Sequence, residues 1–175
     1  MQRGTTSHTG VPMLTGQVGL VPKDGGWASG VVAWASRSNW THVVIAISET
    51  ECVSAEPGGA RIRSNSYYPG TVWSRFPMRP SQRRRIVRYA RSRLGTPYAW
   101  GDYWAVGIAL MCNSWSPEWL RAVVANTDRL LCSQLVDLAL QAGGIHVFHD
   151  YRPAGAVIPA SFGKVFVSRG WAKVP

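Results

Sequence analysis

The sequence predicts one α+β domain, built from a small central antiparallel sheet packed against helices. Its 175 residues are close to a common domain size of roughly 150, and such a chain forms a core without metal or disulfide cross-links. With 46% hydrophobic and only 16% charged residues, the chain is too apolar to be disordered. Gly and Pro supply 18 and 11 residues, which indicates many turns. We expect a single domain over residues 1–175, with residues 1–16 as a flexible or peripheral segment.

Most of the predicted strands lie in the first half of the chain. Residues 42–47, HVVIAI, form a largely β-branched run that suits a central strand buried on both faces. The turn Pro57-Gly58-Gly59 joins two later strands, because Pro and Gly favour the backbone conformations of turns. In chain order, strands are expected at residues 17–21, 42–47, 52–56, 60–63 and 71–76, with a last strand at residues 164–168.

Helices are predicted where apolar residues recur every three or four positions. One helix is expected from Ser81, as its N-cap, to just before Gly95. The most informative helix has leucines at i, i+4 and i+7 from Leu131 and ends at Gly143-Gly144. Further helical segments are expected at residues 27–35 and from Ser116 onward.

The cysteines indicate neither a metal site nor a disulfide framework. Cys52, Cys112 and Cys132 are odd in number and lack paired spacing, so we expect no metal, no cofactor and at least one unbridged thiol. The N-terminal residues lack the apolar run of a secretory signal, and no segment approaches the ~20 apolar residues of a membrane span. The chain is therefore expected to be cytoplasmic at synthesis.

Cys132 is the candidate nucleophile. It falls in the first turn of the helix that follows Leu131, where the positive end of the helix dipole favours thiolate over thiol. Unpaired amides in that turn can also hold the oxyanion that forms when a thiolate attacks a carbonyl. The alternative is a buried, inert cysteine, which is the more common role for an unbridged cysteine on a helix.

A cysteine nucleophile needs a base, and His42 at the start of the predicted central strand is the candidate. Glu56 ends the next strand and is expected to accept a hydrogen bond from the second ring nitrogen. Tyr98, in the loop GTPYAWGD, is expected to form a wall of the site. The alternatives are a structural histidine, an ordinary turn carboxylate and a packed loop tyrosine.

Several short stretches together resemble the circularly permuted branch of the NlpC/P60 papain-like cysteine hydrolases. NWTHVVIAI resembles the histidine strand of that family, LGTPYAW its tyrosine loop and LLCSQLVDLALQAGG its nucleophile helix. GQVGLV is similar to the opening strand of the family and GAVIPASFGKV to its closing segment. VSAEPGGARI is similar to the strand that carries the third, polar residue of the catalytic set. The order His, Glu, Cys along the chain is that of the permuted branch. The resemblance implies a papain-like fold in permuted order.

The resemblance also implies a reaction and its residues. It implies acyl transfer by an amidase or peptidase, commonly on peptides of the bacterial cell wall. The implied triad is Cys132, His42 and Glu56, and the substrate contacts expected are Tyr98, Trp40 and Gln134.

Two positions differ from the family pattern. Gln134 stands where permuted members often carry an acid, and Leu131 where ordinary members carry Asp. These differences bear on substrate contacts more than on thiol chemistry. Because the chain lacks an export signal, a wall substrate implies release at lysis or association with a virion, as for a phage-encoded hydrolase.

Two other functions stay open. The formal net charge of +10 and the pI of about 10.3 suit a non-enzymatic or structural virion or assembly protein that binds polyanions or an acidic protein surface. The alternative for the basic helix is a solvated face that keeps the protein soluble. Related permuted members handle acyl chains on lipids, so a lipid-directed thiol acyltransferase or hydrolase is the other alternative; the Trp-rich residues 100–119 suit a lipid pocket or simply a core. The expected polyanion contacts are Arg83, Arg84, Arg85, Arg88 and Arg91.

Overall fold

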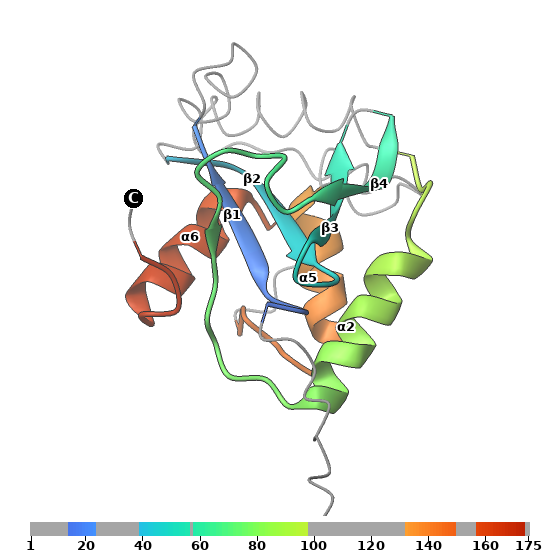
Figure 1. Ribbon diagram of the computed structural model, residues 1–175. Helices are drawn as coiled ribbons and strands as arrows, with labels where there is room; N and C mark the ends of the chain where they lie inside the picture. The colour runs from blue at the N-terminus through green and yellow to red at the C-terminus, as the bar shows by residue number, and fades with distance from the viewer. Residues whose placement is uncertain (1–13, 24–38, 57, 98–131, 150–156, 174–175) are drawn as a thin grey trace, which may run out of the picture.

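The computed structural model describes residues 14–23, 39–56, 58–97, 132–149 and 157–173 (Figure 1). These residues form an antiparallel sheet packed against helices, which confirms the α+β class. The strands are β1 (Val18–Pro22), β2 (Trp40–Ala46), β3 (Glu51–Glu56), β4 (Gly59–Ser64) and β5 (Val72–Trp73). The helices are α2 (Pro80–Ser92), α5 (Cys132–Ala142) and α6 (Pro159–Ser168).

The five-stranded sheet has the order β4-β3-β2-β1-β5, and every neighbouring pair is antiparallel. The prediction that HVVIAI is the central strand is therefore confirmed. Short connections suit this arrangement, because antiparallel neighbours need only a tight turn between them. The turn between β3 and β4 uses Gly58 and Gly59, which have φ of 91° and 108°, a region that favours glycine.

One face of the sheet is covered by α5 and α6, and α2 packs along α5 (Figure 1). On β2, Val43 and Ile45 are buried in the same apolar core as Phe162 of α6. Because side chains alternate along a strand, His42 and Val44 point to the opposite face. The central strand thus serves two different environments.

A β-bulge at the start of β2 changes this alternation. Val21 pairs with His42, but Pro22 pairs with Trp40, so Thr41 is an extra residue in the ladder. The bulge turns Trp40 toward the helices, where it is 6% exposed. A Cβ added at Gly163 of α6 would lie 2.0 Å from Cδ1 of the Trp40 ring, so only glycine fits against this indole.

Helices α2 and α5 approach closely at the end of α5. A Cβ at Gly143 would lie 2.6 Å from Cγ1 of Ile86 on α2, and Gly144 has a φ of 74° that suits a helix end. Arg85 of α2 donates to the Gly143 carbonyl at 3.0 Å. The predicted Gly-Gly end of this helix is confirmed.

The last predicted strand is wrong. Residues 164–168 belong to α6, not to a strand. Their aromatic and β-branched composition favoured a strand, but Phe162 and Phe166 lie one helical turn apart and both are fully buried. Pro159 stands in the first turn, where a missing backbone N–H costs nothing.

The helix predicted from Ser81 exists, but its start and end differ. It begins at Pro80 with Arg79 as the N-cap residue, and the Arg79 amide donates to Gln82 Oε1 at 2.9 Å. The N-cap prediction of Ser81 is wrong because Pro80 already suits the first helical position.

The strand predicted over residues 71–76 is shorter than expected and covers only Val72–Trp73. The Val18 amide donates to the Ser74 side-chain hydroxyl at 2.9 Å. The Ser74 amide still donates to the Val18 carbonyl at 2.8 Å, but a side-chain hydroxyl replaces the backbone carbonyl as the acceptor for Val18, and the regular strand ends before Ser74.

Several predicted features lie outside the described residues. They are the N-terminal residues before 14, the segment at 27–35, the loop residue Tyr98, the Trp-rich stretch at 100–119 with Cys112, and the helix from Ser116.

Candidate functional site

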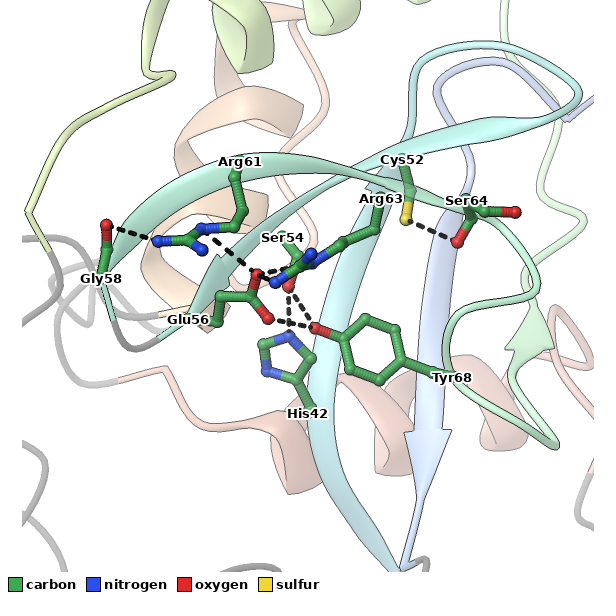
Figure 2. Close-up of polar contacts among 9 residues, drawn as sticks. All are labelled: His42, Cys52, Ser54, Glu56, Gly58, Arg61, Arg63, Ser64 and Tyr68. Atoms are coloured by element: carbon green, nitrogen blue, oxygen red, sulfur yellow. Dashed lines mark hydrogen bonds and ion pairs between the residues drawn. The ribbon is translucent and has the colours of Figure 1, made fainter.

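A polar cluster lies on the face of the sheet opposite α5 and α6 (Figure 2). Ala46 pairs with Cys52, and Cys52 with Arg63, so alternate residues of β2, β3 and β4 share this face. The cluster, named here the open-face network, consists of His42, Ser54, Glu56, Arg61, Arg63 and Tyr68.

His42 is held by two neighbours on this face. Its Nε2 lies 2.8 Å from the Ser54 hydroxyl, and its ring centroid lies 5.2 Å from that of Tyr68. Burial lowers the pKa of His42 to about 4, because charging an imidazole away from water is unfavourable. The ring is therefore neutral at pH 7, and one of its nitrogens carries a lone pair.

Ser54 is the direct partner of the imidazole, and the sequence analysis did not select it. It is fully buried on β3, and its hydroxyl lies 2.7 Å from the Tyr68 hydroxyl. A serine in a short apolar strand carries little signal by itself. The period of two along β3, which sets Ser54 on the same face as Glu56, is the signal that points to it.

Glu56 reaches the imidazole through Tyr68 and Ser54. Its Oε2 accepts from the Tyr68 hydroxyl at 3.0 Å. Its Oε1 accepts from Arg63 Nε at 2.7 Å and lies 3.5 Å from Arg61 Nε. These recorded partners differ from the direct contact with His42 that the sequence suggested. The physical reason is the neighbouring strand β4, whose two guanidinium groups attract the carboxylate.

Cys132 lies on α5, as predicted, and is the first of its described residues. It is 2% exposed and belongs to the apolar core on the helix side of the sheet, with Val43 of β2. The neighbouring Ser133 donates its hydroxyl to the Val157 carbonyl, which anchors this end of α5. Gln134, expected at the substrate, is half-buried in the same turn.

The described residues thus bring His42 and Glu56 into one network and place Cys132 in the core beneath β2 and β3. The second described cysteine, Cys52, has a different environment. It is buried with its sulfur 3.9 Å from the Ser64 carbonyl oxygen, and burial raises its pKa to about 12. Neither Cys52 nor Cys132 forms a disulfide.

Trp40 is part of the core rather than of the open-face network. It packs against Gly163 on the face that carries α6. Tyr98 lies outside the described residues.

The arginines of α2 divide into two groups. Arg83 donates to the Thr15 carbonyl, Arg85 to the Gly143 carbonyl, and Arg91 lies 3.9 Å from Glu51. Arg84 and Arg88 are exposed to solvent. Part of the basic stripe therefore holds the fold together, and part faces solvent.

Comparisons with known proteins give no family. No model of a known protein family matches this chain, and no curated protein matches it. Among the described ranges, no three His, Cys, Asp or Glu side chains gather so that they could hold a metal ion. Within the same ranges, no helix has the length and apolar character needed to cross a membrane.

Proposed function

We propose that this protein is a thiol-dependent hydrolase of amide or peptide bonds, with Cys132 as nucleophile and His42 as base. The observation that carries the proposal is the packing of α5, the helix that carries Cys132, on β2 and β3, the strands that hold His42 and its polar partners. The positive end of the dipole at a helix N-terminus favours a thiolate.

The protonation state of His42 supports its role as base. Because burial keeps the ring neutral at pH 7, it can accept a proton. Since His42 projects from the face of β2 opposite α5, the proposal requires that the imidazole and the Cys132 thiol meet at the end of the strand. The thiolate then attacks the carbonyl carbon, the helix amides hold the oxyanion, and the protonated imidazole returns the proton to the leaving amine. Water hydrolyses the resulting thioester and regenerates the thiol.

We place the substrate among bacterial cell-wall peptides, on the strength of the family resemblance. The net charge of +10 and the exposed Arg84 and Arg88 of α2 agree with this, because cell walls carry carboxylates and phosphates that attract a basic protein. In this proposal the protein reaches the wall at lysis or with a virion.

The first experiment measures thiol reactivity. Limiting iodoacetamide at neutral pH should alkylate Cys132 before Cys52, with each site followed by mass spectrometry. Cys52 is the internal control, because its thiol is also buried and its pKa is raised to about 12. Equal, slow labelling of the two cysteines would contradict an activated thiol.

The second experiment measures hydrolysis. The purified protein should release peptide fragments from peptidoglycan, Cys132→Ala should not, and Cys52→Ala should retain activity. Activity that survives Cys132→Ala would overturn the proposal. Acyl transfer on lipid vesicles without peptide cleavage would favour the lipid-directed alternative.

The polyanion binder is the second candidate, because Arg84 and Arg88 of α2 are exposed. Retention on heparin should then fall with salt and with the paired change Arg84→Ala, Arg88→Ala, and should be unaffected by Cys132→Ala. A protein that binds in this way but shows no selective Cys132 alkylation is a binder and not a hydrolase.

A further inference from the structure

The open-face network is a continuous chain of hydrogen bonds from a carboxylate to an imidazole (Figure 2). Glu56 Oε2 lies 3.0 Å from the Tyr68 hydroxyl, which lies 2.7 Å from the Ser54 hydroxyl, which lies 2.8 Å from His42 Nε2. Two of these links join groups that can each donate or accept. The direction of the whole chain is therefore set from its end.

The end of the chain is fixed by charge. Glu56 Oε1 is held by Arg63 and lies 3.5 Å from Arg61, and an ionised carboxylate only accepts hydrogen bonds. Tyr68 must therefore donate its single proton to Glu56. Burial also raises the pKa of Tyr68, so this proton stays on the phenol at neutral pH.

The remaining directions follow from the proton count. Since the Tyr68 proton points to Glu56, the Tyr68 oxygen accepts from Ser54. The Ser54 proton is then used, so Ser54 accepts from His42 Nε2. Reversing the whole chain would set the lone pairs of Tyr68 and Glu56 against each other at 3.0 Å. Donation from Ser54 to His42 would instead leave the Ser54 and Tyr68 oxygens 2.7 Å apart with no proton between them, and both arrangements are unfavourable away from water.

We propose that this chain holds His42 as the tautomer with a proton on Nε2, leaving the Nδ1 lone pair as the basic atom, and that Ser54, Tyr68 and Glu56 are positioning residues. Figure 2 shows Nδ1 on the side of the ring turned away from Ser54 and Tyr68. The tautomer follows from the network alone, whereas the use of Nδ1 in a reaction rests on the proposed function.

In that reaction the proton of the thiol moves to Nδ1, and the imidazolium that forms keeps donating from Nε2 to Ser54. No proton needs to travel to Glu56, because the carboxylate only orients the dipoles of the two hydroxyls. The chain would thus stabilise the positive ring without itself changing protonation.

The test is the nitrogen NMR spectrum of His42 in the folded, ¹⁵N-labelled full chain at pH 7. We expect Nδ1 to resonate as an unprotonated nitrogen and Nε2 as a protonated one, with His146 and His149 as internal references outside the network. A proton on Nδ1 in the unmodified protein would overturn the proposal, and this measurement needs no variant.

Two variants test whether the chain sets the tautomer. Tyr68→Phe and Ser54→Ala should each shift Nδ1 and Nε2 toward mixed values and slow alkylation of Cys132. Tyr67→Phe is the matched control, because Tyr67 is adjacent and 51% exposed, and it should leave the spectrum unchanged. A tautomer unaltered in both network variants would show that the chain does not control it.

The two proposals fail separately. An Nε2-protonated His42 beside an unreactive Cys132 would remove the hydrolase and leave the tautomer assignment intact. A reactive Cys132 together with a proton on His42 Nδ1 would overturn the tautomer assignment and leave the hydrolase proposal intact.

Discussion

The two faces of the sheet are built by the same strands but depend on different physics. On the helix face, Val43 and Ile45 pack in an apolar core with Phe162. Burial of apolar surface stabilises this core, and it does not depend on the direction of individual contacts. On the other face, His42 and Ser54 join a network in which each group needs a specific partner. One strand can thus contribute to an apolar core and to a polar network at the same time, because its side chains alternate between the two faces.

The helix face should be the more costly to disturb. Phe162 is fully buried and its ring lies 5.1 Å from Phe148 and 5.7 Å from Phe166. We expect Phe162→Ala to lower the free energy of unfolding by about 3–5 kcal/mol, because it leaves a cavity among rings. Chemical denaturation measures the loss. Ile62→Ala, at a side chain that is 38% exposed, is the control, and an equal loss there would break the comparison.

The open face should show the larger dependence on pH. His42 has a pKa of about 4 in the folded chain against 6.5 when unperturbed. Between these values the unfolded chain binds more protons, so the stability is fully present above about pH 6.5 and falls as the pH drops toward 4. From pH 7.5 to pH 5 we expect a loss of about 2 kcal/mol from this residue.

Denaturation of the unmodified protein and of His42→Gln at both pH values isolates this contribution. The variant should lose less stability on acidification, because glutamine does not titrate. Parallel losses in the two proteins would show that the imidazole does not carry the effect.

Tyr68→Phe should have a smaller effect on stability than either change above. It removes the hydroxyl that joins Ser54 to Glu56, so we expect a loss of about 1 kcal/mol from groups left without a partner. Thermal unfolding measures it, with Tyr67→Phe as the neighbouring control. A loss as large as that of Phe162→Ala would mean that the open face is also a packing core.

Arg61→Ala should have the smallest effect. Its side chain is 44% exposed and its Nε lies 3.5 Å from Glu56 Oε1, so we expect a change below about 0.5 kcal/mol. Arg63 is 27% exposed and contacts the same carboxylate oxygen through two nitrogens. Arg63→Ala should therefore cost more, and the opposite order would contradict the assignment of Arg63 as the main partner of Glu56.

The sheet could be predicted from the sequence because its signals are local. The β-branched run at residues 42–47 and the glycines at 58 and 59 each fix a strand or a turn within a few residues. The last helix could not be predicted in the same way. Its residues have strand composition, and only the burial of Phe162 and Phe166 against other elements makes a helix favourable.

The candidate site was predictable only in part. His42 and Glu56 follow from their positions at strand ends, and Cys132 from helical spacing. The period of two along β3 places Ser54 on the same face as Glu56 but does not by itself pair it with His42. Tyr68 follows the end of β4, so its place beside the imidazole depends on how that segment folds back. Contacts of this kind are set by tertiary structure, which no local pattern records.

The extra residue Thr41 shifts the alternation of side chains along β2, so that Trp40 and His42, two positions apart, face opposite sides of the sheet. If Thr41 were deleted, the strand would become regular while Trp40 still faced α6 and His42 still faced Ser54. Deleting one residue between His42 and Ala46 would instead move the side chains on one side of the deletion to the wrong face of the sheet. The strand should therefore tolerate a deletion at Thr41 but not between His42 and Ala46.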